Sequence, residues 1–147
     1  MPGILVGVDG SDHSRQALTW AIHEAAQRQV PLTVLAVRVP APRLATQIFW
    51  NVPALQEDEH DQDVARAAVQ TWVDKVINET GETLPDVRVE VVTGDPAEEL
   101  VKASRDADLL VVGRRGGGGF ARLLMGSVGD KVVHHASSPT VVVPEPR

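Results

Sequence analysis

Three glycines and a serine in the last third of the chain have the residue types and spacing that phosphate binding requires. They are Gly113, Gly116, Gly126 and Ser127, in the pattern G-x2-G-x9-G-S. A hydrophobic run at residues 109–112 precedes them, and a helix-like run follows. Glycine permits φ > 0 and leaves no Cβ between backbone and ligand, and N–H groups at a helix start can bind phosphate oxygens. The segment predicts a phosphate-binding loop, and a flexible surface loop is the alternative.

One carboxylate follows the first hydrophobic run of the chain. Residues 4–8 are apolar and lead directly into Asp9-Gly10-Ser11. The Asp9 side chain could contact a ligand, or it could close an Asx-turn or cap the next helix. A hydrolase or phosphotransferase would also need a base that positions water and a firm magnesium site. The sequence ties no second carboxylate to Asp9.

The other reactive side chains do not form a recognisable catalytic or metal site. Ser11, Asp12 and His13 match a triad in composition only, because neighbours at a helix start point in different directions. The five histidines show no metal-ligand spacing, and there is no G-x-S-x-G elbow. The chain has no cysteine, which excludes thiolate ligands and disulfides.

The charge balance argues against a general nucleic-acid binder. The net charge is -6, whereas binding to nucleic-acid phosphates needs a basic face. Arg114, Arg115 and Arg122 form a small basic patch, and they could equally be solvated charges. No apolar run approaches the roughly 20 residues of a membrane span, and the first residues show no basic leader. We expect a cytoplasmic protein with no nucleic-acid or membrane partner.

Hydrophobic patterning predicts that strands alternate with helices along the chain. Strands are expected at 4–8, 32–39, 87–92, 109–112 and 140–143, and helices at 12–28, 57–80, 96–105 and 128–136. Ser11 and Asp95 are the expected N-caps, and Gly81 is the expected helix stop. Residues 40–56 hold three prolines and are expected to form a long ordered loop.

This alternation predicts an α/β fold in which a five-stranded parallel sheet has helices on both faces. The length fits a single domain over residues 1–147. If the chain starts mid-sheet, moves outward and returns beside its first strand, the strand order is 3-2-1-4-5. Ligands bind where such an order reverses, outside the carboxyl ends of the strands. Asp9 and Gly113 would then flank one crevice.

The whole sequence resembles the nucleotide-binding class of the universal stress protein family. The segments that carry the resemblance are 7–11, 113–116, 124–128 and 136–143. The pattern G-x2-G-x9-G-[ST] is typical of the family's ATP binders and absent from its non-binding class. The resemblance implies a Rossmann-like fold of the adenine nucleotide alpha-hydrolase-like kind. It also implies a bound adenine nucleotide, ATP or a relative of it.

The resemblance further implies individual contacts to the nucleotide. Val8 and Val37 would bracket the adenine, with backbone hydrogen bonds from Val37, and Asp9 would lie near the adenosine, close to a bound Mg²⁺ or Mn²⁺. The chain departs from the family at Gly129, where members often carry serine or threonine and this chain offers only its N–H. The implied nucleotide-binding residues are Val8, Asp9, Val37, Val112, Gly113, Arg115, Gly116, Gly126, Ser127, Val128 and Gly129.

Ser127 is a helix cap whether or not phosphate binds, and the two roles compete for one oxygen. We expect a regulatory switch of the stress response that depends on ATP binding and is not a catalyst. A slow ATP hydrolase or phosphotransferase, and a nucleotide-free dimer module, are the alternatives. Thr140 to Val143 would form a short edge strand, which tends to be covered or paired. The resemblance implies that it pairs with its own copy in a homodimer. No protein partner is indicated.

Overall fold

The computed structural model describes residues 3–39, 59–114 and 129–144. The loop expected at residues 40–56 lies outside these ranges. The strands are β1 (Ile4–Val8), β2 (Leu32–Arg38), β3 (Val87–Thr93), β4 (Leu109–Gly113) and β5 (Thr140–Val143). The helices are α1 (Asp12–Arg28), α2 (Glu59–Thr80) and α3 (Pro96–Ser104), and residues 129–135 are also helical.

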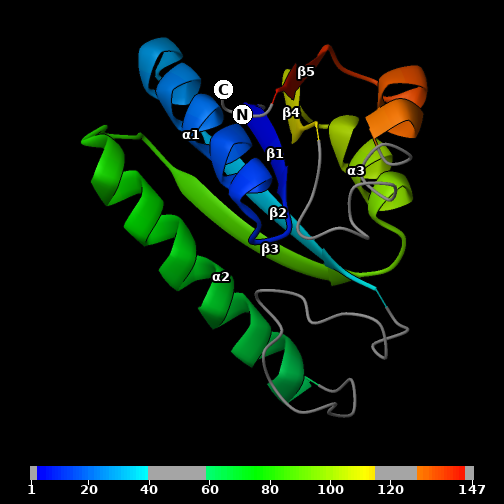
Figure 1. The fold of residues 1–147 in the computed structure, drawn as a ribbon, viewed down its shortest axis with the longest axis horizontal. Coiled ribbons are helices and arrows are strands. Elements are labelled where there is room, and N and C mark those ends of the chain that lie inside the picture. Colours follow the sequence, from blue (N-terminus) through cyan, green and yellow to red (C-terminus); the bar gives the residue numbers. More distant parts are fainter. Residues whose placement is uncertain (1–2, 40–58, 115–128, 145–147) are drawn as a thin grey trace.

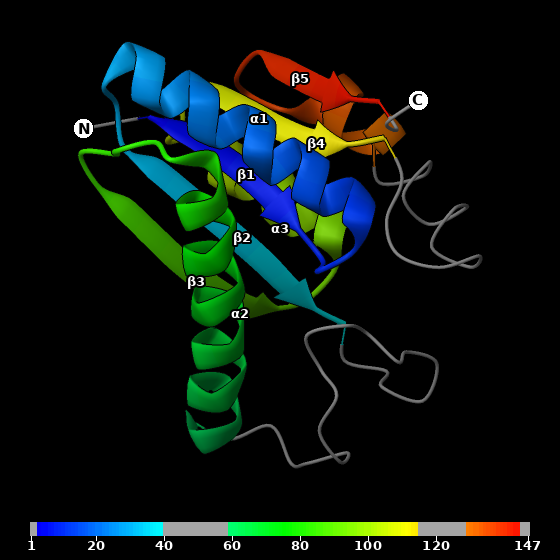
Figure 2. The same ribbon diagram turned by 60° about the vertical axis from the view of Figure 1, so that its left-hand side comes forward.

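The five strands form one parallel sheet in the order β3-β2-β1-β4-β5, which confirms the predicted topology. Figure 2 shows β3 and β5 at its opposite edges. β1 starts in the centre beside β4, although about a hundred residues separate them in the chain. The apolar runs of β1 and β4 are mostly buried, as expected for central strands of a parallel sheet.

Helices cover both faces of the sheet (Figure 1). α1 and α2 pack on one face, over a core that includes Val6, Leu18 and Val73. α3 and the helical residues 129–135 pack on the other, over a core that includes Leu100 and Val132. Burial on two faces explains why alternate residues of the central strands serve different cores. Because all five strands are parallel, their carboxyl ends lie at the same end of the sheet.

The structure confirms the predicted N-caps of α1 and α3. The Ser11 Oγ accepts a hydrogen bond from the Ser14 N–H, and the Asp95 carboxylate accepts one from the Glu98 N–H. Gly81 ends α2 with φ of +72°, a conformation that glycine adopts without steric cost.

Five predicted boundaries shift by one residue, including that of the last helix, which ends at His135 instead of Ala136. β2 stops one residue before the predicted Val39, at the last pair of its ladder with β3, which itself runs on to Thr93. β4 continues through Gly113, and α3 ends at Ser104 instead of Arg105. No helix in the described ranges combines the length and hydrophobicity needed to cross a membrane. The cytoplasmic location stays a prediction.

Candidate functional site

The central strands β1 and β4 separate at their carboxyl ends. Their ladder covers Ile4 to Val6 against Leu109 to Val111, and it stops two residues before either strand ends. Each strand keeps its outer partner to the end: Val8 pairs with Ala36 of β2, and Gly113 pairs with Val143 of β5. The sheet therefore opens between β1 and β4, the position at which the strand order reverses and ligands bind in such sheets.

Backbone carbonyls flank this opening. In a parallel ladder, alternate residues direct both N–H and C=O toward the same neighbour. The Ile4 N–H donates to the Pro31 carbonyl, and the Leu110 N–H donates to the Pro139 carbonyl. By this alternation, the carbonyls of Val37 and Gly113 face the β1 side of their strands, just beyond Val8. Two acceptors therefore point from either side toward the end of β1.

Asp9 holds the turn that leaves β1 for α1. Its Oδ1 accepts a hydrogen bond of 2.9 Å from the Ser11 N–H, and its own N–H donates to the Ser14 Oγ at 3.2 Å. Ser11 and Ser14 are almost fully buried. The Asx-turn that the sequence left as an alternative for Asp9 is present. A ligand role is compatible with it, because a carboxylate has several acceptor positions.

Glycine is needed on each side of Asp9 for a different physical reason. A Cβ on Gly7 would lie 2.8 Å from Leu100 Cδ2, so glycine lets α3 pack closely on β1. Gly10 has φ of +83°, which turns the chain between β1 and α1. Sequence reasoning had no assignment for Leu100 or Ser14, because a side chain that supports a turn from another element leaves no local pattern. Contacts within the chain therefore hold the turn without any ligand.

The valines expected around the base lie on opposite faces of the sheet. Val8 belongs to the core under α1 and α2, and Val37 packs against the core under α3. Val112 is buried in the second core. Their side chains therefore do not face each other across one crevice, and Val37 is placed to act through its backbone.

The predicted phosphate-binding residues fall into two groups. Gly129 opens the described part of the last helix, and nothing lies within 4 Å of a Cβ built on it. Five predicted residues lie outside the described ranges: Arg115, Gly116, Gly126, Ser127 and Val128. The structure brings together the carboxyl ends of β1, β2 and β4 with Asp9, and in the sequence the predicted phosphate-binding segment follows β4.

The described residues contain no group of three or more His, Asp or Glu side chains able to hold a metal ion. A divalent cation at Asp9 would therefore need ligands from elsewhere, such as nucleotide phosphates. His13 lies in the first turn of α1, and its Nδ1 is buried without a hydrogen-bond partner. Sequence reasoning assigned it no role, since its composition-only match to a triad had no geometric support.

Comparison with known proteins gives a consistent relationship over nearly the whole of this chain. The model of the universal stress protein family matches residues 2–144. A universal stress protein of Mycolicibacterium smegmatis is 36% identical over 149 aligned residues, which cover 96% of this chain and 47% of the relative. The chain thus spans about half the length of the curated relatives it matches.

Solved structures give the same fold at similar size. A universal stress protein crystallised in complex with cAMP superposes with a TM-score of 0.66 at 27% identity, covering 97% of this chain and 95% of that one. The universal stress protein UspA from Lactobacillus plantarum superposes with a TM-score of 0.68 at 26% identity, covering 97% of both chains.

Proposed function

The chain belongs to the universal stress protein family, and from this premise we propose that it is a stress-response regulator that binds an adenine nucleotide, ATP in particular. The binding site is the opening between the carboxyl ends of β1 and β4. The observation that carries the proposal is the early end of the β1–β4 ladder at the point of reversed strand order. The cAMP complex of a relative with this fold supports the ligand class.

The adenine lies against the end of β2, where the Val37 backbone can accept from its amino group. The ribose and phosphates follow Gly113 and Gly116. The N–H groups from Gly126 to Gly129 bind the phosphates at the start of the last helix, where the helix dipole favours negative charge. Ser127 and Arg115 add polar contacts. Mg²⁺ would enter with the phosphates, with Asp9 as the carboxylate nearest to it.

Binding without rapid turnover is the function that the described residues favour. Asp9 already accepts the Ser11 N–H, and the described residues offer no cluster of carboxylates to hold a catalytic metal. Phosphoryl transfer depends on positioned metal ions and a group that orients the nucleophile. Slow ATP hydrolysis or phosphotransfer remains the second candidate, because Asp9 lies at the site.

The protein forms a homodimer through β5. By the same alternation, Thr140 and Val142 direct their N–H and C=O groups away from β4, toward the open edge. A two-fold antiparallel pairing centred on Val141 would use all of these groups in both copies. Pro144 has no N–H and limits the pairing to this short segment. Val142 is 40% exposed, which leaves it available for such a contact.

Titration of Gly116→Glu with ATP, AMP and cAMP tests the site. The variant places an anion beside the phosphates and should weaken ATP binding by at least about tenfold. The matched control is Thr71→Glu. Thr71 is exposed on α2, which packs on the face of the sheet opposite to the helical residues 129–135. Equal affinity of both folded variants for ATP would count against the site.

Gly129→Ser tests the phosphate end of the same site by gain of a contact. The added Cβ meets open space, and the hydroxyl supplies a hydrogen bond worth about 0.5–1.5 kcal/mol. ATP affinity should rise by up to about tenfold. Gly129→Ala is the control, because it adds the same Cβ and a better helix former without the hydroxyl. Equal affinities of the two variants would show that a hydroxyl at position 129 does not reach the phosphates, which would count against the proposed phosphate position.

A further inference from the structure

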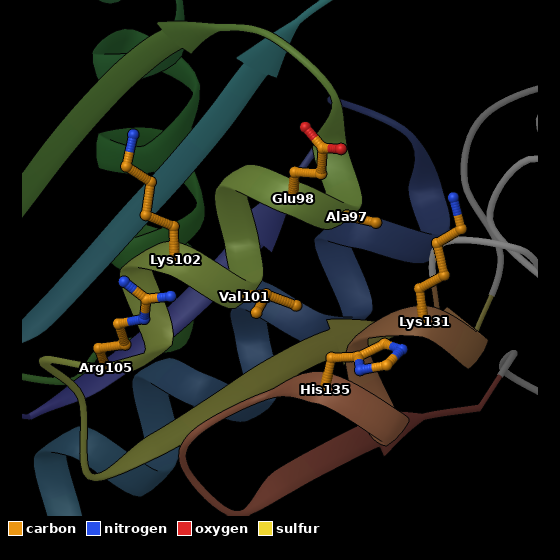
Figure 3. Close-up of a pocket in the computed structure, with 7 residues that line it drawn as sticks. All are labelled: Ala97, Glu98, Val101, Lys102, Arg105, Lys131 and His135. Atoms are coloured by element: carbon orange, nitrogen blue, oxygen red, sulfur yellow. The ribbon is translucent and has the colours of Figure 1, made fainter.

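A groove separates α3 from the helical residues 129–135 on the outer surface, away from α1 and α2 (Figure 3). Its volume is about 390 Å³. Val101 lies at the centre of the view, with Lys102 and Arg105 to one side and Lys131 and His135 on the facing helix. The two helices supply an apolar floor and basic walls.

Positive charge collects in this groove although the whole chain is acidic. Lys102, Arg105 and Lys131 are exposed, and within the described ranges they form no ion pair. Glu98 is the groove's acidic side chain. The net charge of the chain is -6, so a positive surface depends on this local clustering. Such a patch attracts acidic partners and speeds their association.

Helix electrostatics explain only part of the cluster. Lys102 and Arg105 lie at the C-terminal end of α3, where the dipole favours cations by about 0.3–1 kcal/mol. Lys131 is near the beginning of its helix, as described, where the same effect disfavours a cation. The helix dipole therefore does not account for its position opposite Lys102 and Arg105.

We propose that this groove binds an acidic peptide segment of a partner protein. Carboxylates of the segment meet Lys102, Arg105 and Lys131, and a small apolar side chain between them rests on Val101. α3 has nine residues, a length of roughly 13 Å, which an extended segment of about four residues matches.

The lining favours a peptide over a nucleic acid. Among the described residues that line the groove, His135 carries the only aromatic ring, so they offer few of the stacking platforms that single-stranded nucleic acids use. Glu98 can accept a hydrogen bond from a peptide N–H, a donor that a phosphate backbone lacks. Lys131 lies two residues after Gly129 of the proposed nucleotide site, so the test below changes Lys102 and Arg105 of α3, and the inference does not depend on nucleotide binding.

Fluorescence polarisation with a labelled Glu-Asp-Leu-Asp-Glu peptide tests the inference on the full chain, without nucleotide. We expect a dissociation constant below about 1 mM that rises with salt. Lys102→Glu with Arg105→Glu should weaken binding by at least about tenfold. Lys75→Glu with Arg88→Glu makes the same change in net charge at exposed positions outside the groove, and it should leave binding within about twofold.

Three results would overturn the inference. They are no peptide binding up to about 1 mM, an equal loss in both double variants, and tighter binding of a single-stranded oligonucleotide than of the peptide. Circular dichroism of the variants verifies that they are folded, since all four positions are exposed. Failure of the nucleotide titration would leave this test unaffected, so the two proposals can fail separately.

Discussion

The two edge strands of the sheet, β3 and β5, differ in whether their outward backbone groups have hydrogen-bond partners. At β3, the backbone N–H and C=O groups of Val89 and Val91 face away from β2, and the two carbonyls accept hydrogen bonds from Arg66 Nε and Gln62 Nε2 of α2, each at 3.2 Å. At β5, the outward groups belong to Thr140 and Val142. Within the described ranges, no hydrogen bond reaches the outward N–H or C=O groups of these two residues.

This difference assigns different tasks to the two edges. An unpaired edge invites pairing with another chain, and proteins cover the edges that must stay single. α2 covers β3 with its own side chains, so that edge is closed within the monomer. β5 has no such cover from the described elements, and its four residues are all partly exposed. An edge left open on one side only is compatible with the proposed two-fold dimer, in which both copies use the same patch.

The largest expected effect comes from Val141→Pro, on the inner side of β5. The Val141 N–H faces β4, so proline removes a hydrogen bond between β5 and β4 and disturbs the pairing of these two strands. We expect a loss of at least about 2 kcal/mol in the free energy of unfolding, measured by urea denaturation. A stability equal to that of the unmodified chain would show that the inward alternation is misassigned.

Val142→Pro should leave folding intact and weaken the dimer, because its N–H faces outward. Two copies lose one hydrogen bond each, about 1 kcal/mol apiece, which raises the dimer dissociation constant by roughly 30-fold. Analytical ultracentrifugation measures it. Val142→Thr keeps both the N–H and the branched side chain and serves as the control. If the proline variant has an unchanged mass in solution, β5 is not the dimer edge.

A smaller effect is expected at the covered edge. Gln62→Ala with Arg66→Ala exposes two carbonyls of β3 to water, which should cost about 0.5 kcal/mol for each lost bond and promote self-association at micromolar concentration. Gln70→Ala is the control, because Gln70 bonds only to the exposed Asp74 among the interactions described. A double variant that neither loses stability nor associates would show that α2 does not protect the edge.

The sequence predicted the fold because its signals are local. Buried strands, the Ser11 and Asp95 caps and the Gly81 stop each follow from residue type and spacing, and the strand order follows from a few topological rules. Boundaries shifted by a residue where tertiary pairing, as between Arg38 and Thr93, decides the end of a strand.

Less of the candidate site than of the fold could be predicted from the sequence. Asp9 and Gly113 were placed at the same edge by topology, but the early end of the β1–β4 ladder has no signature in either strand. The contact between Gly7 and Leu100 joins residues far apart in the chain. The outward cover of β3 depends on Gln62 and Arg66, which look like ordinary surface residues of a helix. These features arise from packing between elements, and composition alone does not encode them.

The central claim is that the chain binds an adenine nucleotide between β1 and β4. Mass spectrometry of the denatured supernatant from freshly purified protein, followed by calorimetric titration with ATP and AMP with and without Mg²⁺, tests it most directly. The account predicts co-purified adenine nucleotide or micromolar ATP binding, with ATP intact over hours. No adenine nucleotide in the supernatant and no binding at millimolar concentration would contradict it.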